Sequence, residues 1–103
     1  VKPSCMLVCE DNYSNAHGTP WLYKEMGIGK LIGAPVPGTM TAVWWENIGQ
    51  YTFGIPQVGT KDNRGNYLEN QQLEPDIECY VTPEDMLRGV DTQIQAAVKE
   101  LMK

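Results

Sequence analysis

The sequence of 103 residues has one histidine, one phenylalanine and three cysteines, and fewer basic than acidic residues. Eight Lys and Arg against thirteen Asp and Glu give a formal net charge of −5, which argues against nucleic-acid binding because phosphate contacts require a basic patch. No apolar run approaches the roughly 20 residues that cross a bilayer, so we expect no membrane span. With a single histidine and no ligand spacing, we expect neither a metal site nor a cofactor.

The three cysteines, Cys5, Cys9 and Cys79, contain no CxxC pair. Cys5 and Cys9 fall on one face of a predicted strand about 13 Å apart, which is too far for a disulfide. We therefore expect buried free thiols. The first residues, Val1-Lys2-Pro3-Ser4, have neither a signal-peptide core nor an initiator Met, so we expect a piece excised from a longer protein.

The segment Leu7–Pro35 has the pattern of a strand, a tight polar turn, a helix and a second strand. The apolar run Met6–Cys9 ends at the turn Glu10–Asn15, a helix follows, and Lys30–Gly33 is the expected second parallel strand. This arrangement holds a serine still at the carboxyl edge of a parallel sheet. Ser14 is therefore the first candidate for a functional residue.

The second half of the chain predicts short antiparallel strands and two helices. Strands are expected from their β-forming residues and bounding turns at Thr39–Trp45, Gln50–Ile55, Tyr67–Asn70 and Ile77–Val81. Thr82 and Asp91 are the expected N-caps of two C-terminal helices. The consecutive Trp44 and Trp45 should point to opposite faces of their strand, one of them into the core.

Three stretches in order, GIGKLIGAPVPG, LENQQLEPDIE and VTPEDMLRGVDTQIQAAVKEL, resemble the family S41 serine peptidases. The resemblance is to the C-terminal half of the catalytic domain of the C-terminal processing and tricorn core peptidases, and it covers Ser4 to Leu101. It implies an α/β, crotonase/ClpP-like half-domain: a βαβ unit, then a small antiparallel sheet and C-terminal helices. Residues 1–103 would form one domain whose N-terminal part is absent from the chain.

The resemblance places the family's nucleophile on Ser14 and gives the backbone N–H of Asn15 the role of oxyanion donor. A second donor would be a glycine upstream of Val1. From the residues alone, Ser14 is more simply a turn hydroxyl that caps the helix. The ordered motifs favour the nucleophile.

The base for such a serine is harder to find in this chain. The processing peptidases use a lysine at the position of Thr39, whereas the tricorn type uses an upstream histidine and a glutamate that corresponds to Glu69. Glu69 could equally be a solvated hairpin charge, and Gln72 stands where the family pattern has glycine. His17 is a possible base, but a helix N-terminus disfavours the imidazolium that a base becomes.

Two functions follow. In the first, which the resemblance implies, we expect a fragment of a serine endopeptidase that hydrolyses peptide bonds by acyl transfer through Ser14 and is inactive on its own. Alternatively, it is a catalytically inactive S41-like binding or assembly module that lacks a general base. The expected partners are a peptide or protein substrate, and either the missing N-terminal part or a second copy of the chain, which would cover an open sheet edge.

Overall fold

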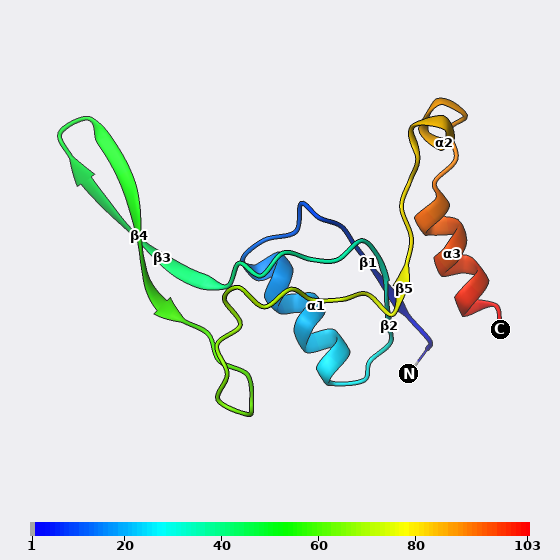
Figure 1. Cartoon of the computed structure of the whole chain (residues 1–103), viewed down its shortest axis with the longest axis horizontal. Helices are drawn as coiled ribbons and strands as arrows, with labels where there is room; N and C mark the ends of the chain where they lie inside the picture. Colours follow the sequence, from blue (N-terminus) through cyan, green and yellow to red (C-terminus); the bar gives the residue numbers. More distant parts are fainter. Residues whose placement is uncertain (1) are drawn as a thin grey trace.

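The computed structural model describes residues 2–103; Val1, where the expected excised piece begins, lies outside the described residues. Figure 1 shows a central α/β unit, a long β-hairpin that projects from one side of it, and C-terminal helices on the other side. The buried hydrophobic side chains lie in and around the α/β unit: Val8, Leu31, Ile32, Ala34, Val36, Leu68 and Leu73. This unit therefore positions the candidate site.

Two parallel strands and one crossover helix form the predicted βαβ unit. β1 (Cys5–Val8) pairs in parallel with β2 (Lys30–Gly33), and α1 (Asn15–Glu25) connects them. The helix ends just before Gly27, which takes the left-handed φ of 62° that a glycine after the C-terminus of a helix provides. Gly33 is required for a different reason: its φ is 140°, and a Cβ there would overlap the carbonyl oxygen of Val8.

The strand expected at Ile77–Val81 is shorter than predicted and belongs to a different sheet. β5 (Ile77–Glu78) lies parallel to β2, so the first sheet has the order β1-β2-β5. Asp76 accounts for this placement, since its N–H donates to the carbonyl of Leu31 and its Oδ2 accepts the Leu31 N–H, both at 2.8 Å. The antiparallel sheet is consequently smaller than the sequence analysis expected.

That antiparallel sheet is a single hairpin of β3 (Thr41–Ile48) and β4 (Tyr51–Gly59). The expected end of the strand at Trp45 is not observed, because β3 continues to Ile48 and the chain reverses at Gly49, whose φ is 59°. The strand predicted at Tyr67–Asn70 does not form either: only an isolated bridge joins Tyr67 to Lys61, and Asn70 turns the chain with a φ of 61°.

The hairpin has an apolar face that no other part of residues 2–103 covers. In the register of the two strands, one face presents Ala42, Trp44, Ile48, Tyr51, Phe53, Ile55 and Val58, together with one charged residue, Glu46. Trp44 and Trp45 are 61% and 68% exposed, so the prediction that one of them lies in the core is wrong. They do sit on opposite faces of the strand, as the alternation requires.

The C-terminal helices begin as predicted. α2 (Pro83–Leu87) is capped by the Thr82 hydroxyl, which accepts the Asp85 N–H at 3.1 Å, and α3 (Thr92–Leu101) by Asp91, which accepts the Ile94 N–H at 2.9 Å. Of the elements described, α3 contacts β1 and β2. The architecture is thus α/β: a βαβ unit, a small antiparallel sheet and C-terminal helices.

Cys5, Cys9 and Cys79 are free, but they are half-buried rather than buried. Within residues 2–103, no helix combines the length and apolar character that a membrane span would need.

Candidate active site

Ser14 lies at the junction between the strand–turn segment and α1, in an unusual backbone conformation. It is the N-cap residue of α1, with φ 54° and ψ −122°. A non-glycine residue rarely adopts a positive φ, and such strain costs on the order of 1–3 kcal/mol where it persists. Two side-chain contacts of Asn12 hold the turn: its Oδ1 accepts the Cys9 N–H at 3.1 Å, and its Nδ2 donates to the carbonyl of Ala16 at 2.9 Å.

The backbone of Ser14 is fully engaged, whereas its hydroxyl makes no capping hydrogen bond. Its N–H donates to the carbonyl of Thr39 at 2.8 Å, and its own carbonyl accepts the N–H groups of His17 and Gly18 at 2.9 and 3.0 Å. The helix-capping interpretation of the hydroxyl therefore does not describe this structure. The strained turn before α1 thus leaves the serine hydroxyl without a capping partner within residues 2–103.

The first N–H groups of α1 differ in their hydrogen bonds. The N–H groups of Ala16, His17 and Gly18 donate to carbonyls of Tyr13 and Ser14. The N–H of Asn15 has no such acceptor within residues 2–103. An open N–H at the start of a helix, where the helix dipole is positive, favours a negatively charged oxygen.

Glu69 is bound to the loop that carries Thr39. Its Oε2 accepts the N–H of Met40 at 2.6 Å and both the N–H and the hydroxyl of Thr41, at 2.7 and 2.8 Å. These hydrogen bonds, with that of Met40 the largest contribution, hold the pKa of Glu69 below its usual range. Glu69 is therefore not a solvated hairpin charge. Glu69 is linked to Ser14 through this loop, because the carbonyl of Thr39, the residue before Met40, accepts the Ser14 N–H.

His17 is completely buried in the first turn of α1. Neither of its ring nitrogens has a hydrogen-bond partner among residues 2–103, so the ring does not bind Ser14 here. Burial lowers the pKa of His17, and this effect outweighs the charge of Glu69 and the nearby backbone of Gln71, which raise it. Of the predicted residues, Ser14 and Asn15 are consecutive at the start of α1, and Glu69 is linked to Ser14 through the loop at Thr39. The His17 ring is close enough to Glu69 for their charges to interact, but it forms no hydrogen bond to Ser14.

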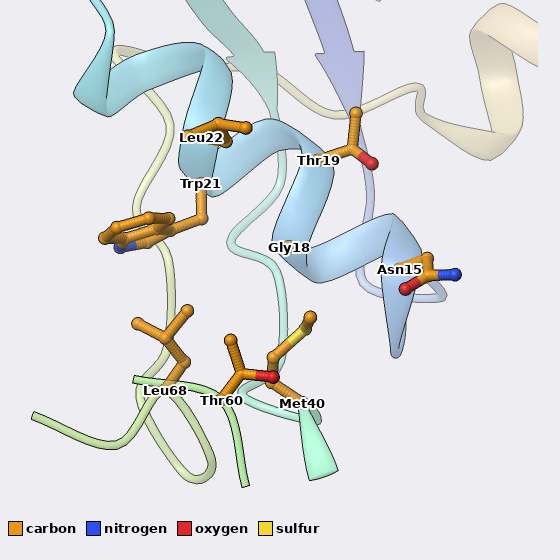
Figure 2. Close-up of a pocket in the computed structure, with 8 residues that line it drawn as sticks. All are labelled: Asn15, Gly18, Thr19, Trp21, Leu22, Met40, Thr60 and Leu68. Atoms are coloured by element: carbon orange, nitrogen blue, oxygen red, sulfur yellow. The ribbon is translucent and has the colours of Figure 1, made fainter. Parts of the chain in front are cut away.

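A pocket beside Asn15 was missed by the sequence analysis. It has a volume of about 320 Å³ and lies between α1 and residues that precede or follow the hairpin. Figure 2 shows Met40 and Leu68 pointing toward the helix from the opposite wall, with Trp21 closing one side. The sequence signal was Gly18, an isolated glycine within a helix, because a Cβ there would meet the Met40 side chain at 2.6 Å.

Comparison with known proteins places this fold and turn in a family. The family model "Peptidase family S41" matches residues 1–79, which is most of the chain. The chain belongs to peptidase family S41. Its first 79 residues include the Ser14 turn, the loop at Thr39 and Glu69, so the S41 match covers the whole candidate site.

Two solved structures and one curated protein show how the S41 chain relates to longer relatives. The crystal structure of the tricorn protease superposes with a TM-score of 0.76 at 26% identity, over 94% of this chain and 10% of that one. The structure of mature CPAF superposes with a TM-score of 0.72 at 23% identity, over 99% and 19%. A Chlamydia pneumoniae protein, CPj1016/CpB1054, is 30% identical over 99% of this chain and 17% of its own length. The S41 chain thus spans a fifth or less of each of these proteins.

Proposed function

We propose that the chain is the part of an S41 serine endopeptidase, of the tricorn core or C-terminal processing type, that carries the nucleophile. In this proposal residues 1–103 are the C-terminal part of a crotonase/ClpP-like catalytic domain. The observation that supports it most strongly is the backbone of Ser14, which keeps a strained φ of 54° while its hydroxyl caps nothing. Strain of this kind persists where a functional geometry requires it.

The proposed reaction is acyl transfer. The Oγ of Ser14 attacks the carbonyl carbon of a peptide bond while its proton passes to a general base. The oxygen of the tetrahedral intermediate accepts a hydrogen bond from the N–H of Asn15. The C–N bond then breaks, the amine leaves with the proton, and water hydrolyses the ester that remains on Ser14.

Glu69 would act on this reaction by holding the loop. Its carboxylate fixes the N–H groups of Met40 and Thr41, the two residues after Thr39. The carbonyl of Thr39 in turn accepts the N–H of Ser14. Glu69 is thus proposed as a positioning residue that holds the turn at Ser14 in its observed conformation.

The general base is proposed to come from outside residues 1–103. The position of the processing peptidases' lysine is Thr39, and the ring of His17 is buried without a contact to Ser14. The uncovered apolar face of the hairpin gives independent support for a partner, because exposed apolar surfaces of this kind mark interaction sites. The proposed partner is the N-terminal part of the same domain or a second copy of the chain.

Labelling of the full-length protein with a fluorophosphonate tests this function. The chain offers a matched control, since Ser4 and Ser14 are its only serines. We expect Ser14→Ala to lose the label that depends on this chain, and Ser4→Ala to retain it. Equal labelling of wild type and Ser14→Ala, or no labelling of either, would remove Ser14 from the nucleophile role.

A second function, an inactive binding or assembly module, is favoured by one observation. Within residues 2–103, no lysine or histidine side chain hydrogen-bonds to Ser14. In that case the strained turn and the apolar hairpin face would serve association alone. This function predicts that the wild-type protein takes no label, and that Ser14→Ala binds the partner as well as the wild type does.

A further inference from the structure

We propose that His17 is a positioning residue for the reaction at Ser14. Its ring N–H donates a hydrogen bond to the carbonyl of Gln71 in the assembled active site, which joins the first turn of α1 to the segment that carries Glu69. This inference rests on the proposed function of Ser14. It adds a residue that acts on the serine turn without touching the substrate.

Three segments are arranged around Ser14, and hydrogen bonds join two of their three junctions. The start of α1 is joined to the loop 38–41 by the Ser14 N–H, which donates to the carbonyl of Thr39 at 2.8 Å. The same loop is joined to the segment 69–71 by the Glu69 carboxylate and by a main-chain hydrogen bond of 2.6 Å. Within the part of the chain that the structure describes, no hydrogen bond joins the start of α1 to the segment 69–71.

His17 occupies that third junction. Its ring is completely buried, and neither ring nitrogen has a hydrogen-bond partner within residues 2–103. Burial has the largest effect on the pKa of His17 and lowers it, whereas the Glu69 carboxylate and the Gln71 backbone raise it from across the junction. Buried polar atoms are nearly always hydrogen-bonded, so the partner of this ring is to be sought among these two groups.

The carbonyl of Gln71 is the acceptor that fits. The N–H of Gln71 already donates to the carbonyl of Leu68 at 3.1 Å, whereas its carbonyl accepts no main-chain hydrogen bond from residues 2–103. The Oε2 of Glu69 already accepts three hydrogen bonds from the loop. In a neutral imidazole one nitrogen donates and the other accepts, so a single acceptor fixes both the tautomer and the orientation of the ring.

This hydrogen bond would complete a closed set of links around the serine. Hydrogen bonds at active sites are often long or poorly aligned in the free protein and tighten in the complex, which accounts for an unpaired ring here. With the third junction closed, Glu69 could not shift relative to Ser14 without moving α1. A small displacement of a reacting group is enough to slow a reaction strongly, so the loss of this link should be measurable at Ser14.

The first test is the spectroscopic signature of the ring in the full-length protein. Long-range ¹H–¹⁵N spectra distinguish the two neutral tautomers of an imidazole, and comparison with His17→Gln identifies the signals of His17. We expect one neutral tautomer at neutral pH, with a ring N–H proton that exchanges slowly with water. A protonated ring, or a mixture of tautomers whose N–H exchanges as fast as that of free imidazole, would overturn the inference.

The second test measures how fast a fluorophosphonate labels Ser14. In this reaction the Oγ of Ser14 forms a bond to phosphorus, fluoride leaves, and the proton passes to the base. His17→Leu has no hydrogen-bonding group and should slow the labelling at least about tenfold. The side-chain amides of asparagine and glutamine place an N–H near the positions of Nδ1 and Nε2, so one of His17→Asn and His17→Gln should restore most of the wild-type rate.

Leu31→Val is the matched control. It alters another completely buried residue of the α/β unit without removing a polar group, so it reports the effect of a weakened core alone. Urea unfolding curves of all variants show that each is folded under the labelling conditions. We expect Leu31→Val to label at the wild-type rate.

The outcomes separate this inference from the proposed function. If Ser14 is labelled and His17→Leu reacts as fast as Leu31→Val, the inference is wrong and the nucleophile stands. If His17→Leu is slow and neither amide variant recovers, the ring acts by its shape and the inference is likewise overturned. If nothing labels Ser14 in the wild type, the proposed function fails and the positioning role fails with it, whatever the spectra show of the ring.

Discussion

The backbone N–H of Ser14 donates to the carbonyl of Thr39 at 2.8 Å, which ties the first turn of α1 to the loop before the hairpin. Glu69 binds the next two N–H groups of that loop, at 2.6 and 2.7 Å. Three segments far apart in the sequence are thereby fixed around one serine, by a main-chain hydrogen bond at Thr39 and by the side-chain carboxylate of Glu69. These hydrogen bonds hold the backbone of Ser14 in place, so the turn does not need a hydrogen bond from the serine hydroxyl.

The strain at Ser14 can be separated from its chemistry. Because φ is 54°, glycine should be accommodated there without the cost that alanine retains. We expect Ser14→Gly to exceed Ser14→Ala in free energy of unfolding by about 1 kcal/mol, while both lose the fluorophosphonate label. Urea denaturation followed by tryptophan fluorescence measures the difference. Equal stability of the two variants would show that the turn is not strained.

Removal of the Glu69 carboxylate should loosen the loop. Glu69→Ala leaves the N–H groups of Met40 and Thr41 without their acceptor, which we expect to cost about 1–3 kcal/mol and to reduce labelling of Ser14. Glu69→Gln keeps one acceptor oxygen and should retain most of the stability. Glu46→Ala, at an exposed position on the hairpin, is the control. A Glu69→Ala variant that unfolds and labels like this control would contradict the positioning role.

The carboxylate of Glu69 should make the free energy of unfolding depend on pH. Since the folded-state pKa of Glu69 is below its unfolded value, its contribution is complete above the unfolded pKa and is lost as the pH falls through the folded pKa. Between pH 5 and pH 3, the free energy of unfolding should therefore fall less for Glu69→Gln than for the wild type. Parallel pH profiles would mean that Glu69 is not bound as described.

The βαβ unit, both C-terminal helix caps and the Ser14 turn could be predicted because each depends on local sequence. Local structure is determined here by apolar runs, by Gly27 and by the capping residues Thr82 and Asp91. Each of these influences only the few residues around it. Three features depend on contacts between distant segments and could not be predicted. These are the parallel pairing of β5 through Asp76, the hydrogen bonds of Glu69 to the loop, and the exposure of Trp44.

The buried ring of His17 should make stability fall with acidification. Its folded-state pKa lies below that of the unfolded chain, so the unfolded state binds the proton first as the pH drops below about 6.5. The free energy of unfolding should decline there by at most about 1.4 kcal/mol per pH unit. His17 is the only histidine, so His17→Leu should flatten the profile between pH 7 and pH 5.5. An unchanged slope in His17→Leu would contradict a buried neutral ring.

The apolar face of the hairpin should make residues 1–103 associate when expressed alone. Trp44 lies on this face and Trp45 on the opposite one, although both are similarly exposed. We expect Trp44→Ser to reduce binding of a hydrophobic dye and the association seen by sedimentation several-fold more than Trp45→Ser. A wild-type chain that is a monodisperse monomer and binds no dye would contradict the half-domain proposal.

The central claim is that Ser14 is the nucleophile, and the most direct measurement maps the covalent adduct. The full-length protein is treated with a fluorophosphonate, digested and sequenced by tandem mass spectrometry. We expect the phosphonyl mass on Ser14, in the peptide that contains Asn12 and Asn15, and no adduct there after heat denaturation. An adduct confined to another residue of the protein, with Ser14 unmodified, would contradict it.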